Sequence, residues 1–327
     1  MSSTYRRILI ALAAMCLTFG LAACGDDDSS DSGNAGDTPA ADDGKLIQKE
    51  AANSSKPTIT VGSKNFTEQY ILGEIYAQTL EAQGFKVKRR LNLGSEQVAY
   101  KALKAGGIDM YPEYTGTALT SFFEVKTDDV PKDADEAYDL AKEKYAAQGI
   151  TALERTPFQN TYVIASTKKT AGEAGDPKTV SELFQKAPKL SISGFPECRQ
   201  RQDCLLGLRS QFGFKGKFVS SDGKFNDLDG GQSDLTLAFG TDPQLALTDK
   251  YVAYEDDKQF FPPYHITLGI RDETAKTIGE KAVQTLVGVQ AGMTEEAMRE
   301  LNRRVELDKQ QAKEVGAAYL KEEGFVK

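Results

Sequence analysis

The chain has 327 residues, with 40 Lys or Arg against 48 Asp or Glu, and its formal net charge is −8 at pH 7. An acidic chain of this kind is a poor nucleic-acid binder, because such binding depends on clustered positive charge. The sequence contains no Walker loop and no dinucleotide-binding glycine pattern. We therefore expect no nucleic-acid partner and no cofactor.

The N-terminus is typical of a secretory signal peptide. Arg6 and Arg7 precede an apolar run over residues 8–23 that is short for a membrane span. The run ends in Leu-Ala-Ala-Cys-Gly, which resembles a bacterial lipobox. We expect residues 1–23 to be removed and Cys24 to carry a lipid. The alternative is a secreted protein with an incidental cysteine.

Residues 24–56 are predicted to form a disordered tether. The segment after Cys24 consists mainly of Asp, Ser, Gly, Ala and Pro, with eight acidic and three basic residues. Such a composition buries too little apolar surface to offset the entropy lost on ordering. A segment of this kind would link the membrane to a globular domain.

From residue 57 onward, short apolar runs alternate with helical patterns, which predicts an α/β architecture. We expect the strand that begins at Ile108 to stop at Pro112, because proline cannot donate to a ladder. Strands are predicted near residues 58–62, 85–91, 108–111, 150–153, 158–166, 189–194, 217–220, 234–239, 251–254 and 266–270. Helices are predicted near residues 68–83, 95–105, 118–123, 133–148, 179–186, 204–212, 242–247, 280–290, 294–306 and 310–323.

The order of these elements predicts two lobes. The chain is expected to cross into a second lobe near residue 160 and to return near residue 265. Residues 57–159 and 266–327 would then form the first lobe, and residues 160–265 the second. Two crossovers of this kind would make a hinged clamp.

The cysteines and the single histidine limit the remaining chemistry. Cys16 leaves with the signal peptide, so Cys198 and Cys204 remain as a spare pair, most simply a disulfide outside the cytoplasm. Two thiolates and His265 are too few ligands for a metal site. Ser166 and Lys169 fit an S-x-x-K pattern, but the partner motifs of serine β-lactamase-like enzymes are missing.

Two longer motifs carry a family resemblance. Gly62-Ser63-Lys64-Asn65-Phe66-Thr67-Glu68-Gln69 follows the first strand, and Tyr111-Pro112-Glu113-Tyr114-Thr115-Gly116-Thr117 follows about fifty residues later. In order and spacing they resemble motifs of the solute-binding proteins of ABC importers for glycine betaine, choline and carnitine. The resemblance implies a two-lobed periplasmic-binding-protein-like clamp of type II.

The ligands of that family carry a trimethylammonium group, which cannot donate hydrogen bonds and is best held by aromatic faces. The chain has no Trp, so Tyr and Phe must supply them. The resemblance implies a cation cage of Tyr114, Tyr162 and Tyr264, with Phe239 where the family has a tyrosine.

The polar end of the ligand needs hydrogen-bond donors. The resemblance implies Lys64 in the first motif, Thr117 at a helix start, and an arginine after a Pro-Glu pair. Spacing favours Arg201 over Arg199, and either could hold a carboxylate in a bidentate manner. A choline ligand would offer these groups a hydroxyl instead.

The resemblance implies a monomeric, lipid-anchored binding protein on the extracytoplasmic face of a bacterial cell membrane. It would deliver its ligand to an ABC permease with an ATPase subunit, and it would not be an enzyme. Three alternatives remain: the same fold with another solute, such as an aromatic or amino-acid-derived compound; a hydrolase using Ser166 and Lys169; and a sensory or adhesive lipoprotein.

Overall fold

The structure is a computed structural model that describes residues 45–327. The predicted signal peptide, Cys24 and most of the predicted tether lie outside the described residues. Within residues 45–327, no helix is long and apolar enough to cross a membrane. The same part of the chain holds no group of His, Cys, Asp and Glu that could bind a metal ion.

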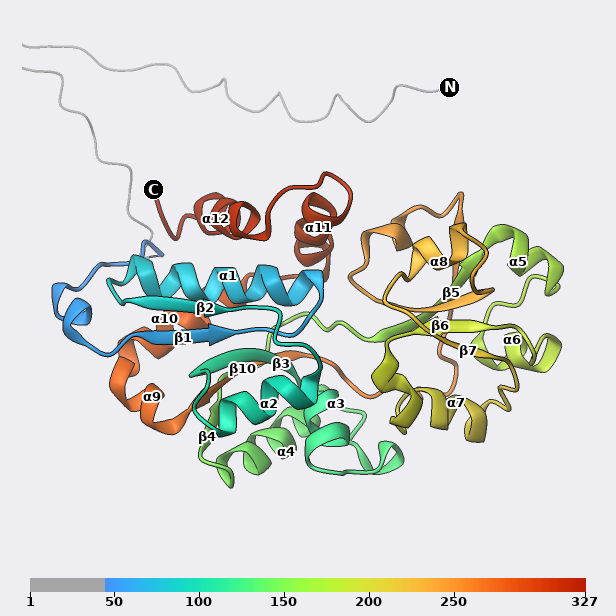
Figure 1. The fold of residues 1–327 in the computed structure, drawn as a ribbon, viewed down its shortest axis with the longest axis horizontal. Coiled ribbons are helices and arrows are strands. Elements are labelled where there is room, and N and C mark those ends of the chain that lie inside the picture. Colours follow the sequence, from blue (N-terminus) through green and yellow to red (C-terminus); the bar gives the residue numbers. More distant parts are fainter. Residues whose placement is uncertain (1–44) are drawn as a thin grey trace, which may run out of the picture. The chain divides into compact units, whose positions relative to one another are not determined.

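The framework consists of two five-stranded sheets (Figure 1). The first has the order β2 (Val87–Arg90), β1 (Ile59–Gly62), β3 (Met110–Tyr114), β10 (Ile266–Arg271) and β4 (Ile150–Ala152). The second has the order β7 (Phe218–Ser220), β6 (Ile192–Gly194), β8 (Leu235–Phe239), β5 (Tyr162–Thr167) and β9 (Tyr251–Tyr254). β1 runs parallel to both neighbours, whereas β10 and β5 run antiparallel to theirs.

Helices cover the first sheet on both sides, and its central strand β3 is therefore buried along its whole length. Figure 1 shows α1 with α11 and α12 on one side and α2 with α4 on the other. Ile71, Leu72 and Ile75 of α1 have no solvent exposure and join the core around β1. These helices and their companions are α1 (Thr67–Ala82), α2 (Glu96–Lys104), α3 (Thr115–Thr117), α4 (Ala134–Ala146), α9 (Asp272–Ile278), α10 (Glu280–Ala291), α11 (Glu295–Glu306) and α12 (Ala312–Glu322).

The second sheet buries Ile164, Leu235 and Leu237, which belong to the same hydrophobic cluster as the residues around β1. A separate cluster in this lobe includes Phe225 and Tyr251. Its helices are α5 (Lys168–Glu173), α6 (Val180–Lys186), α7 (Leu205–Gln211) and α8 (Phe225–Asp229), together with short 3-10 helices η4 (Pro196–Gln200) and η5 (Pro243–Ala246). The predicted two-lobed α/β fold is therefore confirmed.

The two crossovers lie side by side between the sheets. The N–H of Thr156 donates to the carbonyl of Ile266 at 2.8 Å, and the N–H of Asn160 donates to the carbonyl of Tyr264 at 3.0 Å. Gln159 and His265 form an antiparallel bridge. Both predicted crossovers are thus present, and they bring Asn160 and Tyr264 to the space between the lobes.

The prediction that Pro112 stops its strand is wrong. β3 continues to Tyr114, and Pro112 pairs with Leu268 of β10. On the other side, β1 pairs with β3 only at Met110. The ladder with β1 has therefore ended before Pro112. The proline's missing N–H costs no hydrogen bond on that side of the strand.

The prediction of a disordered tether up to residue 56 is wrong for its last part, residues 45–56. Ala51–Ser55 form a 3-10 helix, and the side chain of Asn53 is buried and donates to the carbonyl of Gln83 at 2.9 Å. The N–H of Ile47 donates to the carbonyl of Phe325 at 2.9 Å. These contacts are made to distant residues, so the local composition gave no sign of them.

Candidate functional site

A cavity with a volume of about 60 Å³ lies between the two lobes. A cavity of this size suits a compact solute. All seven side chains predicted to contact a ligand line it: Lys64, Tyr114, Thr117, Tyr162, Arg201, Phe239 and Tyr264. The other lining residues are Asn65, Phe66, Ser95, Glu96, Asn160, Phe195 and Glu197.

One wall of the cavity is a continuous chain of aromatic rings. Ring centroids are 6.0 Å apart for Tyr114 and Phe66, 5.3 Å for Phe66 and Phe239, and 5.4 Å for Phe239 and Tyr162. Tyr264 meets Tyr162 edge to face at 5.5 Å, and Phe195 stacks on Phe239 at 5.7 Å. The rings come from both lobes and from a crossover, so the wall is complete only when these parts are together.

Local structure explains why these rings meet. Tyr162 begins β5 and Phe239 ends β8, and the two are direct partners in the antiparallel register. Cross-strand partners place their side chains on the same face of a sheet. Tyr114 ends β3, and Phe66 stands directly before α1, so the first lobe presents its two rings from one edge of its sheet.

Two of the tyrosine hydroxyls are held by buried carboxylates. The hydroxyl of Tyr114 donates to Oε1 of Glu68 at 2.7 Å, and that of Tyr264 donates to Oδ2 of Asp203 at 2.6 Å. Burial raises the pKa of both tyrosines well above the ordinary value. The two phenols therefore stay neutral, and their hydrogen bonds fix the orientation of the rings.

Lys64 lines the cavity, and its charge is paired with a carboxylate of the protein. Its ammonium group forms an ion pair with the fully buried carboxylate of Glu113. Its Nζ also lies 4.4 Å from the ring centroid of Tyr114. The geometry places a positive charge beside one cage ring, and the predicted contact of Lys64 with a ligand carboxylate remains a prediction.

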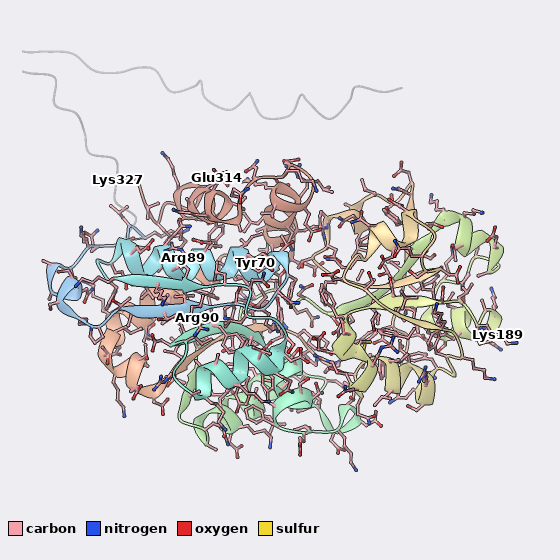
Figure 2. The ribbon with its side chains drawn as sticks, in the orientation of Figure 1. Tyr70, Arg89, Arg90, Lys189, Glu314 and Lys327 are labelled. Atoms are coloured by element: carbon pink, nitrogen blue, oxygen red, sulfur yellow. A yellow bond between two sulfur atoms is a disulfide. The ribbon has the colours of Figure 1, made fainter. Side chains whose placement is uncertain are left out.

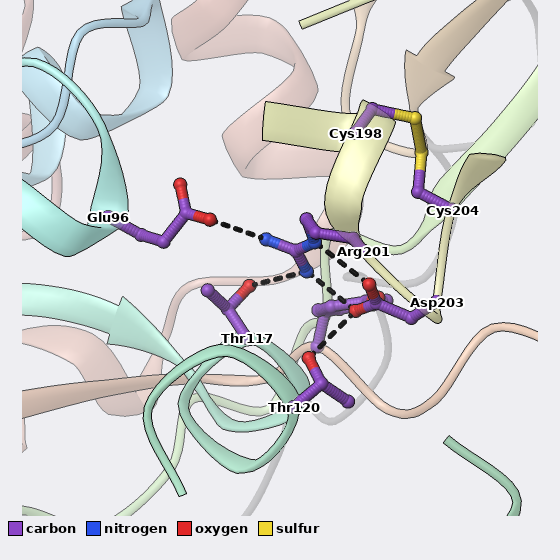
Figure 3. Close-up of a disulfide and its surroundings, with 8 residues drawn as sticks. Glu96, Thr117, Thr120, Cys198, Arg201, Asp203 and Cys204 are labelled. Carbon is purple, nitrogen blue, oxygen red and sulfur yellow. Dashed lines mark hydrogen bonds and ion pairs between the residues drawn. A yellow bond between two sulfur atoms is a disulfide. The ribbon is translucent and has the colours of Figure 1, made fainter. Parts of the chain in front are cut away.

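Arg201 lies on the loop closed by the disulfide between Cys198 and Cys204 (Figure 3). Its Nε donates to Oδ1 of Asp203 at 2.8 Å and its Nη2 to Oδ2 at 2.6 Å. Burial alone raises the pKa of Asp203, but Arg201, Tyr264 and Thr120 outweigh it and hold this pKa below the ordinary value. The guanidinium fork is thus engaged with a carboxylate of its own loop.

The same guanidinium crosses to the first lobe. Its Nη1 lies 3.3 Å from Oε1 of Glu96, and its Nη2 lies 3.5 Å from Oγ1 of Thr117 (Figure 3). Oγ1 of Thr120 donates to Oδ2 of Asp203 at 3.0 Å. These contacts join the disulfide loop of the second lobe to α2 and the segment after β3.

The charges on the cavity wall favour a cation. Lys64 and Arg201 each have a carboxylate behind them, whereas Glu96 and Glu197 add two further carboxylates to the lining. Within the described residues, Oε1 of Glu96 accepts only from Arg201, and its Oε2 has no hydrogen-bond partner. Oε2 is therefore available to a donor on a ligand.

The residues of the alternative predictions lie elsewhere. Oγ of Ser166 is 2.6 Å from the hydroxyl of Tyr254, while the exposed Lys169 pairs with Glu173 at 3.8 Å. Ser166 and Lys169 therefore do not form a nucleophile and base. Arg199 donates to Ser220 at 2.7 Å and does not line the cavity.

Sequence reasoning missed seven side chains that line the cavity, among them Phe66, Glu96, Asn160, Phe195 and Glu197. Phe66 lies in the first motif, residues 62–69. Glu197 belongs to the Pro-Glu pair before Arg199 and Arg201, and Phe195 directly precedes that pair. Aromatic residues beside a binding motif were thus a signal that could have been used. Glu96 gave no such signal, because an acidic residue in the first turn of a helix ordinarily complements the helix dipole.

Comparison with known proteins agrees with this geometry. The family model described as the substrate binding domain of ABC-type glycine betaine transport systems matches residues 57–322. The glycine-betaine-binding protein of Pseudomonas aeruginosa is 32% identical over 284 residues, covering 81% of this chain and 88% of that protein.

A second relative and a solved structure are also similar to this chain. The ergothioneine transport permease/ergothioneine binding protein of Helicobacter pylori is 29% identical over 285 residues, covering 86% of this chain. This chain spans only about half, 50%, of that protein's length. A crystal structure titled as a glycine betaine/carnitine/choline ABC transporter has the same fold, with a TM-score of 0.65 and 23% identity, covering 81% of this chain and 98% of that one. The chain belongs to the family of substrate-binding domains of ABC-type glycine betaine transport systems.

Proposed function

We propose that this protein captures a quaternary-ammonium solute, such as glycine betaine, choline or carnitine, and delivers it to the permease of an ABC importer. The observation that carries the proposal is the chain of rings formed by Tyr114, Phe66, Phe239, Tyr162 and Tyr264 around a small cavity. These rings come from both lobes, as a clamp that encloses its ligand requires.

The chemistry of a trimethylammonium group explains why rings suit it. The group carries a full positive charge but has no N–H to donate, so a single carboxylate would be desolvated without a directional hydrogen bond. Each aromatic face offers a negative quadrupole and covers methyl groups, and a desolvated contact of this kind contributes about 2 kcal/mol. The surplus of carboxylates around the cavity adds a favourable field for a cation.

The relatives support a role in transport. The relative from Pseudomonas aeruginosa is named a glycine-betaine-binding protein, and the relative from Helicobacter pylori is named an ergothioneine transport permease/ergothioneine binding protein. We propose that the protein works on the extracytoplasmic face of the cell membrane, held by a lipid on Cys24. A tether raises its concentration near the permease. A ligand that contacts rings of both lobes favours the closed form further, and the permease would recognise that form.

The amino-acid-derived alternative remains a second candidate. The Helicobacter pylori relative is named for ergothioneine, and the aromatic wall could also stack a planar ligand. The small cavity favours a compact solute over a larger one. The titration that tests the proposal should therefore include ergothioneine.

Calorimetric titration of the full-length protein with glycine betaine, choline, carnitine and ergothioneine tests the proposal. We expect saturable binding of at least one of the first three, and loss of that binding in Tyr114→Ala. A folded protein that binds none of them would overturn the quaternary-ammonium assignment. Binding of ergothioneine alone would select the second candidate.

A further inference from the structure

A second set of contacts between the lobes centres on Glu68, which is 2% exposed and lies in the first turn of α1. Its Oε1 accepts hydrogen bonds from the hydroxyl of Tyr114 at 2.7 Å and from Nδ2 of Asn160 at 3.0 Å. Its Oε2 accepts from Oγ1 of Thr241 at 2.5 Å and from Nδ2 of Asn302 at 3.3 Å. One carboxylate therefore joins β3, the first crossover, the turn after β8 and α11.

Neutral donors alone satisfy this carboxylate. Among residues 45–327, Glu68 forms no ion pair, and each of its oxygens accepts from two uncharged groups. A glutamine of the same size would offer one acceptor and one amino group, which would face groups that now donate. Buried donors left without an acceptor are costly, so this site needs both carboxylate oxygens.

The turn after β8 is held from several directions. The N–H of Thr241 donates to Oδ1 of Asn160 at 3.1 Å, and its carbonyl accepts from Asn302 at 3.1 Å. The carbonyl of Gly240 accepts from Nη2 of Arg299 at 2.9 Å. This turn directly follows Phe239, so it determines where that ring stands in the aromatic wall.

We propose that Glu68 is a positioning residue that couples closure of the two lobes to the geometry of the aromatic cage. It orients Tyr114 of the first lobe through one oxygen and holds the turn behind Phe239 of the second lobe through the other. Separation of the lobes takes Thr241 away and leaves a buried carboxylate short of a donor. The closed form, with the cage assembled, is thereby favoured.

Matched variants separate this role from ordinary structural support. Glu68→Gln and Thr241→Val each remove one side of the contact between the lobes. Glu74→Gln is the control for the first: Glu74 lies on the same helix, is 5% exposed, and pairs at 2.8 Å with Arg89. Arg89, which is labelled in Figure 2, belongs to the first lobe. Thr79→Val is the control for the second, since among residues 45–327 the hydroxyl of Thr79 bonds only within α1, to Ile75 at 2.8 Å.

Two measurements on the full-length proteins test the proposal. Small-angle X-ray scattering without ligand reports lobe separation and does not depend on the proposed function. Titration with choline and glycine betaine reports the cage, and this half of the test rests on the proposed function. We expect Glu68→Gln and Thr241→Val each to expand the molecule and to weaken binding about tenfold or more.

Further outcomes distinguish the possible failures. The double variant should be little worse than Glu68→Gln alone, because both changes break one contact. The controls should lower the unfolding midpoint without changing compactness or affinity.

Equal compactness of Glu68→Gln and Glu74→Gln would overturn the proposal. If the wild type binds neither ligand, the proposed function fails, while scattering still decides the role of Glu68. Thr241→Val leaves Glu68 in place, so it decides the matter if Glu68→Gln does not fold.

Discussion

Nη2 of Arg201 lies 2.6 Å from Oδ2 of Asp203, two residues further along the same disulfide-closed loop. The guanidinium therefore enters the cavity with its charge largely balanced, and its other side faces Glu96 rather than open space. A ligand carboxylate placed here would gain Arg201 but would also meet Glu96. A ligand hydroxyl would find an acceptor in Glu96 and no repulsion.

The first prediction follows from this charge balance and concerns ligand preference. Choline and glycine betaine share the trimethylammonium group and differ in a hydroxyl or a carboxylate. We expect the wild type to bind choline more tightly. Glu96→Gln should shift the ratio of the two affinities toward glycine betaine by about tenfold, because one like charge is removed. Paired calorimetric titrations measure this ratio, and an unchanged ratio would remove Glu96 from ligand selection.

The second prediction concerns the stability supplied by Asp203. Asp203→Asn leaves Arg201 buried with only Glu96 as an ionic partner, and we expect a loss of about 3 kcal/mol in the free energy of unfolding. Urea denaturation at pH 7 measures it. The control Asp229→Asn breaks a half-exposed pair with Lys250 and should change stability by less than about 1 kcal/mol.

The pH dependence of the same group has a definite sign. The pKa of Asp203 is held below its ordinary value of 3.8, so its stabilising contribution is present above that value. The contribution is lost as the pH falls through the lowered pKa. Asp203→Asn should therefore unfold with a shallower dependence on pH in this acidic range, and identical slopes would contradict the assignment.

The third prediction separates the ring of Tyr114 from its hydroxyl. Tyr114→Ala removes a cage face and should abolish measurable binding. Tyr114→Phe keeps the face but leaves Glu68 with one donor fewer, so we expect affinity to fall by about tenfold. Tyr100→Phe is the control, because Tyr100 stacks on Phe122 outside the cavity at 4.2 Å. Equal losses in Tyr114→Ala and Tyr114→Phe would mean that the hydroxyl, and not the ring, matters.

The fourth prediction concerns the disulfide. Cys198 and Cys204 close a short loop that carries Arg201 and Asp203. Replacing both cysteines with serine should lower stability by about 2 kcal/mol through loop entropy. Affinity should also fall, because the loop no longer holds Arg201 against Thr117 and Glu96. Reduction of the wild type should reproduce both effects, and full affinity after reduction would show that the loop is held without the bond.

The fifth prediction uses the only histidine of the chain. His265 lies in the second crossover, 8% exposed, with its Nδ1 2.9 Å from the carbonyl oxygen of Thr156. Burial lowers its pKa below the ordinary value of 6.5. Its stabilising contribution is thus present above pH 6.5 and is lost as the pH falls through the lowered pKa. We expect the unfolding midpoint to drop between pH 7 and pH 5.5, and we expect a smaller drop in His265→Gln. Equal drops in the two proteins would contradict this role of His265.

The alternation of apolar runs and helical patterns predicted the lobes, because these patterns are local. The cage residues Tyr114, Tyr162 and Phe239 came from the family resemblance and not from strand patterns. The structure places each of these rings at a strand end. The placement of the second crossover likewise brought Tyr264 to the same cavity.

The parts that could not be predicted depend on distant residues. Glu68 was visible within a motif, but its contact with Asn302 spans 234 positions of sequence. The pairing of Lys64 with Glu113 and of Arg201 with Asp203 turned two expected ligand contacts into groups already engaged with carboxylates. Pro112 was misjudged because the extent of pairing with β1 is a property of the sheet and not of the strand.

The most direct test of the central claim compares choline with its neutral carbon analogue, in which a tert-butyl group replaces the trimethylammonium group. The two ligands have nearly the same shape and the same hydroxyl, so only the charge offered to the rings differs. Calorimetry on the full-length protein should show choline binding at least about 30-fold more tightly, the equivalent of one desolvated cation–π contact. Equal affinities would show that the cavity selects shape alone, and a folded protein that binds neither would contradict the account.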